Sequence, residues 1–164
     1  MHPETTFDAQ PLERALVNLS ALLCALVITG CATGPDARRV VTSPDAPEAI
    51  GPYSQAIRAG NTLYLSGQIA TDPKTKQVMA SADIETQTKL VLDNLLAVLK
   101  AEGMDLSNIV STTVYLKDMN NFSKMNAAYG AYFKSNPPAR ATVEVARLPR
   151  DAQVEISAIA VRSQ

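Results

Sequence analysis

The sequence predicts one globular domain that combines β-strands with two helices. Two patterns support this expectation: stretches in which apolar and polar residues alternate, as they do in strands, and two stretches with apolar residues at helical spacing. The chain has 164 residues, 46% of them hydrophobic, which is enough for one domain with a substantial core.

The expected elements follow one another along the chain. We expect strands at 40–42, 56–59, 62–68, 109–117, 140–146 and 153–161, and helices at 83–102 and 120–134. Gly60-Asn61 forms a tight turn between the second and third strands, because these residues tolerate positive φ. Gly103 ends the long helix, and Asn120 or Asn121 caps the shorter one. The order of helix and then strand implies a crossover connection.

The first thirty residues form a segment of different character. An apolar run at 15–28 is shorter than a bilayer span and is followed by Ile-Thr-Gly-Cys, which resembles a bacterial lipoprotein signal. That resemblance implies a signal peptide at 1–30, lipidation of Cys31, a tether at 31–38 and a globular domain at 39–164. The acidic residues Glu4, Asp8 and Glu13 depart from the positive start that such signals usually have. The alternative is a buried helix with an incidental cysteine.

Charge and composition exclude several classes of function. With 15 basic and 16 acidic residues the chain is almost neutral, which argues against nucleic acid as a partner. His2 is the only histidine, so the sequence offers no zinc-binding pattern, Cys-His pair or Ser-His-Asp triad. We therefore expect no metal. Cys24 falls in the segment expected to be removed, which leaves Cys31 without a partner for a disulfide.

Arg140 is the leading candidate for a binding residue. Residues 137–138 are both proline and hold the chain extended before the alternating stretch that Arg140 begins. Arg140, Thr142 and Glu144 are expected on one face of that strand, with the alanine and valines between them on the other. A guanidinium fork fixed at a sheet edge suits both oxygens of an organic carboxylate. The alternative is a surface arginine at the start of a strand.

Four further positions are candidates for the same site. Tyr53 precedes the expected hairpin, and Ser66 and Gly67 end it, where a glycine lets a ligand or another backbone approach. Glu155 alternates with apolar residues on the last strand, so its carboxylate needs a partner, a hydrogen bond or a function. The alternative for Tyr53 is a half-buried packing role.

Asn126 is the remaining candidate, beside the apolar face of the second helix. That face is expected to hold Phe122, Met125, Tyr129, Tyr132 and Phe133. The Asn126 amide either contributes to a ligand site or forms a hydrogen bond with a backbone group across the core.

Several short motifs together resemble the RidA family, also called YjgF/YER057c/UK114. The motifs lie at 51–56, 66–68, 87–94, 126–129, 138–140, 145–149 and 154–156, and the resemblance covers about residues 40 to 161. It implies an α+β fold like Bacillus-type chorismate mutase, with a mixed sheet, two helices on one face and a homotrimeric barrel.

The resemblance also implies an activity. The family's enzymatic branch hydrolyses 2-imino acids and their enamines, such as 2-aminoacrylate, 2-iminopropanoate and 2-iminobutanoate, to 2-keto acids and ammonia without a cofactor. In that reading Arg140, Glu155 and Tyr53 are catalytic. Arg140 binds the carboxylate, Glu155 orients and activates the water, and Tyr53 shapes the pocket. Ser66, Gly67, Asn126 and Thr142 bind the substrate; Thr142 stands where many relatives carry a cysteine.

The resemblance leaves alternatives open. Branches of the family without the arginine make a non-enzymatic trimeric binding module or a chaperone-like holdase an alternative function, and ribonuclease activity is a third, disfavoured by the near-neutral charge. The leader implies a lipid-anchored protein of the cell envelope or periplasm, with membrane contact through the anchor alone. If the leader is not a functional signal, the protein is cytoplasmic.

Overall fold

The computed structural model describes residues 38–162. The expected signal peptide, Cys31 and nearly all of the expected tether lie outside the described residues. Among the residues described, no helix has the length and apolar character needed to cross a bilayer.

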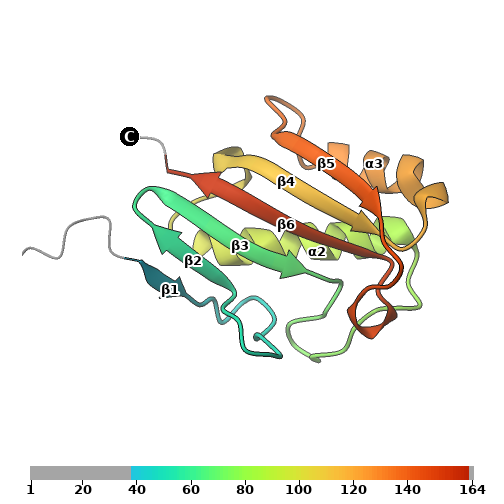
Figure 1. Cartoon of the computed structure of the whole chain (residues 1–164), viewed down its shortest axis with the longest axis horizontal. Helices are drawn as coiled ribbons and strands as arrows, with labels where there is room; N and C mark the ends of the chain where they lie inside the picture. The colour runs from blue at the N-terminus through green and yellow to red at the C-terminus, as the bar shows by residue number, and fades with distance from the viewer. Residues whose placement is uncertain (1–37, 163–164) are drawn as a thin grey trace, which may run out of the picture. The chain divides into compact units, whose positions relative to one another are not determined.

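Six strands form one mixed sheet in the order β1-β2-β3-β6-β4-β5 (Figure 1). They are β1 (Arg39–Val41), β2 (Ala56–Ala59), β3 (Thr62–Gln68), β4 (Ile109–Leu116), β5 (Ala139–Glu144) and β6 (Val154–Val161). The pair β4 and β5 is parallel and the other neighbours are antiparallel. The expected hairpin of β2 and β3 is confirmed, and Gly60 has a φ of 57° at its turn.

The long helix is α2 (Ile84–Lys100), and its caps follow from the sequence. The Asp83 side chain accepts a hydrogen bond from the Thr86 backbone N–H, which satisfies one of the free donors of the first turn. At the other end Gly103 has a φ of 63°, as expected for a glycine that ends a helix. Figure 1 shows α2 running behind the sheet, where it contacts β3 and β6.

The second helix, α3 (Phe122–Gly130), is shorter than expected and starts differently. A 3-10 turn, Met119–Asn121, precedes it, and the Asp118 side chain caps that turn by accepting from the Asn120 N–H. Glu144 on β5 accepts from the Met119 N–H at 2.7 Å. Asn121 occupies the N-cap position of α3, one of the two positions expected, but its side chain makes no capping hydrogen bond.

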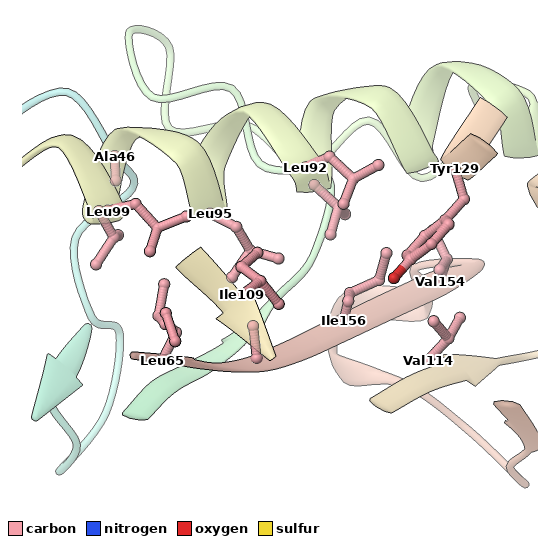
Figure 2. Packing of buried hydrophobic residues seen from close by; sticks show 14 of the residues in the cluster. Ala46, Leu65, Leu92, Leu95, Leu99, Ile109, Val114, Tyr129, Val154 and Ile156 are labelled. Atoms are coloured by element: carbon pink, nitrogen blue, oxygen red, sulfur yellow. The ribbon is translucent and has the colours of Figure 1, made fainter. Parts of the chain in front are cut away.

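The core lies between α2, α3 and one face of the sheet (Figure 2). Leu92, Leu95 and Leu99 of α2 are fully buried and point at the strands. In Figure 2, Leu65 and Ile109 lie below Leu99 and Leu95, and Val154 lies beside Tyr129. The expected apolar stripe of the long helix is confirmed. The α+β arrangement, a mixed sheet with two helices on one face, is also confirmed.

One strand departs from simple alternation. Regular alternation would place Val110 on the same face as Val114, but Val110 is 48% exposed whereas Ile109 is buried. The pairing of β4 with β6 shifts register between Ile109 and Ser111, and such a bulge moves the residues before it to the other face.

Candidate functional site

A cavity of about 510 Å³ opens beside the end of β3. Three segments line it: the loop that leads into β2, the end of β3 with the loop that follows, and the turn that leads into β6. The lining residues are Pro47, Glu48, Ala49, Ile50, Tyr53, Gln55, Ser66, Gly67, Gln68, Ile69, Thr71, Lys76, Pro149, Arg150 and Glu155. Of the seven residues expected in the site, Tyr53, Ser66, Gly67 and Glu155 are therefore together.

Buried amides hold the walls of this cavity. The Gln55 side chain is buried, accepts from the Ser43 N–H at 2.6 Å, and donates to the carbonyls of Ser43, Ala46 and Pro47. Asn94 of α2 donates to the Thr71 carbonyl at 2.9 Å. Breaking the hydrogen bonds of a buried amide costs free energy, because its polar groups are left without partners. These hydrogen bonds therefore fix irregular loops that have no strand-pairing hydrogen bonds.

Glu155 lies directly against Gly67. A Cβ added at Gly67 would lie 2.0 Å from the Glu155 Oε1, so only glycine leaves room for the carboxylate in this position. The strand pairing opens here as well, with a register shift between Leu65 and Gln68 opposite β6. Burial raises the pKa of Glu155 above that of a solvated glutamate. The result is a half-buried carboxylate that protonates more easily than usual, in the wall of a cavity.

Ser66 and Tyr53 complete this group. The Ser66 hydroxyl donates to the Ser54 carbonyl at 2.7 Å, which ties the end of β3 to the loop opposite. Tyr53 is 47% exposed and its hydroxyl accepts from the Ile50 N–H at 3.3 Å. Tyr53 thus lines the cavity.

Arg140 belongs to a second group of residues. Its Nη2 donates to the Asn126 Oδ1 at 2.7 Å, and its guanidinium carbon lies 4.6 Å from the centre of the Tyr129 ring. Asn126 is exposed, so its alternative role as a bond to backbone across the core is wrong. Phe122, expected to face inward, is 37% exposed and lies 5.9 Å from the same guanidinium.

The two groups face opposite sides of the sheet. Arg140 pairs with Thr112 on β4, and the Thr112 hydroxyl bonds the Tyr129 hydroxyl at 2.8 Å, which places both on the helix side. Glu155 pairs with Tyr115, three residues further along β4 and therefore on the other side. Within one chain the expected single site is thus divided, because Arg140 is absent from the cavity that holds Glu155.

Thr142 remains with the Arg140 group. It follows Arg140 on the same face of β5, and its hydroxyl is buried with no hydrogen-bond partner among the described residues. The structure does not bring it to the cavity.

The cavity also contains charged residues that sequence reasoning missed. Lys76 and Glu48 form an exposed ion pair at 3.1 Å, and both line the cavity, as does Arg150. Arg150 and Asp151 have φ of 54° and 60°, a backbone conformation that residues other than glycine rarely adopt. The sequence has no glycine at these two positions that would predict a positive φ. Within residues 38–162, no group of three or more His, Cys, Asp and Glu side chains could hold a metal ion.

Comparisons with known proteins agree with this architecture. The family described as Endoribonuclease L-PSP matches residues 43–162. A RutC family protein of Pyrococcus horikoshii is 51% identical over 125 residues, which cover 76% of this chain and 98% of that protein. A human protein named 2-iminobutanoate/2-iminopropanoate deaminase is 47% identical over 125 residues, covering 76% of this chain and 90% of the human one.

A solved structure adds the likeness of the fold. Escherichia coli TdcF, determined with bound serine, superposes with a TM-score of 0.73 at 39% identity and covers 76% of this chain and 99% of TdcF. The match of the family to most of the chain and the near-complete coverage of these relatives lead to one conclusion. The chain belongs to the Ribonuc_L-PSP family, which includes the RidA and RutC proteins.

Proposed function

We propose that this protein hydrolyses 2-imino acids to 2-keto acids and ammonia, at a site formed by two copies of the chain. The observation that carries the proposal is the position of Glu155, a half-buried carboxylate against Gly67 in the wall of a cavity that could admit a small acid. A relative of this length and similarity bears the name of that activity.

Two copies are needed because of the geometry of one. Arg140 is on the helix side of the edge strand β5, and Glu155 is on the other side of the sheet. The family is known for homotrimers and for small-molecule binding. In a trimer, Arg140 of one copy would reach the cavity of the next copy and bind the substrate carboxylate there. Tyr53 and Ser66 of that next copy would border the substrate.

The chemistry follows from these groups. Arg140 would hold the carboxylate, and the Glu155 carboxylate would take a proton from a water molecule as the water oxygen bonds to the imine carbon. The protonated imine becomes a tetrahedral carbinolamine. Glu155 would then return that proton to the nitrogen. As the C–N bond breaks and ammonia leaves, the hydroxyl oxygen would form the keto C=O bond and pass its proton to the Glu155 carboxylate, which frees the keto acid. The raised pKa of Glu155, caused by burial, suits a group that must both accept and return a proton during the reaction.

An imine-trapping assay tests this proposal. An amino-acid oxidase generates 2-iminopropanoate from alanine in the presence of semicarbazide, and the semicarbazone is followed by absorbance. Wild-type protein should suppress the semicarbazone, while Arg140→Ala should lose at least about a hundredfold in kcat/KM because the carboxylate loses its charged partner. If wild type gives no suppression, or if Arg140→Ala suppresses equally, a non-enzymatic binding module is the better description.

We further propose that the leader directs the protein to the cell envelope and that Cys31 carries a lipid. The support is the sequence pattern before Cys31 alone. Expression of the full chain with a fatty-acid probe should label wild type and not Cys31→Ser, and wild type should fractionate with membranes. An unlabelled wild-type chain in the cytosol would contradict this.

A further inference from the structure

Arg140 is held by three side chains of α3 that recur at one-turn intervals. Phe122, Asn126 and Tyr129 occupy positions i, i+4 and i+7 of the helix and thus lie on one face. Asn126 accepts from one end of the guanidinium, and the rings of Tyr129 and Phe122 lie 4.6 and 5.9 Å from its carbon. We call these three residues the α3 clamp.

Tyr129 is the rigid part of the α3 clamp. It is only 4% exposed, its hydroxyl bonds the buried Thr112 hydroxyl at 2.8 Å, and its ring stacks on Phe133 with centroids 4.5 Å apart. Burial raises the pKa of Tyr129, and the effect outweighs the opposing influence of Thr112 and Arg140. The ring is therefore a neutral phenol, and it attracts the guanidinium through its π face.

The clamp leaves part of the guanidinium free. Nη2 donates to Asn126, whereas Nε and Nη1 of Arg140 have no hydrogen-bond partner in the described part of the chain. A free arginine side chain loses considerable rotamer freedom when it binds a ligand, and a side chain fixed beforehand loses less.

We propose that Tyr129 is a positioning residue for substrate binding: its ring fixes the Arg140 guanidinium so that the free donors are presented to the substrate carboxylate. This inference rests on the proposed function, since it takes Arg140 as the group that binds the acid. Tyr129 touches no reacting atom and acts only through Arg140.

Steady-state kinetics of imine hydrolysis with Tyr129→Leu test the inference. A cation–π contact of this kind corresponds to a factor of about three to ten, so KM should rise by about that factor. The value of kcat should stay within about twofold, because the contact is made equally before and in the transition state. Tyr129→Phe keeps the ring and should keep a KM near that of wild type.

Tyr132→Leu is the matched control. Tyr132 is an aromatic residue just beyond α3 that packs against the same core, but its hydroxyl bonds Asp93. Among the described residues, no hydrogen bond or cation–π interaction joins Tyr132 to Arg140. It should lower the melting temperature and leave KM unchanged. If Tyr129→Leu folds and leaves KM unchanged, or if the two leucine variants change KM and kcat alike, the role of Tyr129 is only structural and the inference is wrong.

Kinetics of Phe122→Leu and titration with 2-oxobutanoate test the clamp independently of Tyr129→Leu kinetics. If Tyr129→Leu does not fold, Phe122→Leu changes the exposed ring of the clamp, and a KM equal to wild type would count against the clamp. Titration with 2-oxobutanoate, a product of the proposed reaction, reports the carboxylate contact without catalysis. If wild type hydrolyses no imine but Tyr129→Leu binds 2-oxobutanoate more weakly than wild type does, the clamp is supported and the proposed function is rejected. If both bind 2-oxobutanoate equally, the clamp is rejected.

Discussion

Arg140 and Glu155 lie on opposite faces of the same sheet, on strands separated only by β4. Arg140 contacts α3 on the covered face, whereas Glu155 meets Gly67 and the cavity on the other. A reaction that needs both groups must therefore use two copies of the chain.

Two inactive variants should restore activity when they assemble together. Arg140→Ala retains Glu155, and Glu155→Gln retains Arg140, so a mixed oligomer contains interfaces at which both groups are intact. If the copies mix at random in equal amounts, about a quarter of the interfaces should be complete, and activity should reach about that share of wild type. Co-refolding the two variants before the imine assay measures this.

The control for that experiment is a mixture combined without unfolding, in which subunits do not exchange during the assay. It should stay inactive. Co-refolded mixtures with no activity above the separate variants would mean that Arg140 and Glu155 do not serve one site.

Gly67→Ala should remove activity with little loss of stability. The new Cβ would lie 2.0 Å from the Glu155 Oε1, and the end of a flexible side chain can move aside at small cost. The carboxylate would then leave its place beside the water, so we expect a fall in kcat of about a hundredfold or more. Kinetics and thermal unfolding measured together test both statements.

Gly130→Ala is the matched control for this change. Nothing lies within 4 Å of a Cβ at Gly130, the last residue of α3, and alanine favours helix over glycine by up to about 1 kcal/mol. Its activity should equal that of wild type. Equal activity of the two alanine variants would show that the Glu155 position is unimportant.

The raised pKa of Glu155 predicts how activity and stability depend on pH. As a base Glu155 must be ionised, so kcat/KM should rise with pH through a pKa above the ordinary glutamate value, and Glu155→Gln should lose this rise. In the folded protein the protonated form is favoured. Glu155 thus supports folding fully below the pKa it has in the unfolded chain, and this support is lost as pH rises through the raised value.

Denaturant unfolding of wild type and Glu155→Gln over this pH range measures the effect on stability. The free energy of unfolding of Glu155→Gln relative to wild type should increase with pH across that window and then become constant. A difference that decreases instead would mean that the carboxylate is stabilised in its ionised form.

Gln55→Leu should destabilise the cavity wall strongly. The change removes one acceptor and three donor contacts to the loop at 43–47 and leaves buried backbone groups without partners, which costs about 2–4 kcal/mol in the free energy of unfolding. The exposed Gln77 provides a control, since Gln77→Leu should change stability by less than about 0.5 kcal/mol. Chemical denaturation distinguishes the two, and similar losses would contradict this role for Gln55.

The sequence alone determined the elements and most of their faces. Period-two alternation placed Arg140 and Thr142 on one face of β5, and Gly60 set the hairpin turn, because these signals depend on neighbouring residues only. The stripe of α2 likewise depends on local spacing. The family motifs also identified Tyr53, Ser66, Gly67 and Glu155, which the structure brings to one cavity.

The tertiary structure decided what depends on contacts between distant segments. The bulge that exposes Val110 arises from pairing with β6, and the grip of α3 on Arg140 from the crossover that sets β5 beside β4. The separation of Arg140 from Glu155 has the same origin. A strand's alternation says which residues share its face, but only the pairing of strands and the placement of helices say which face that is.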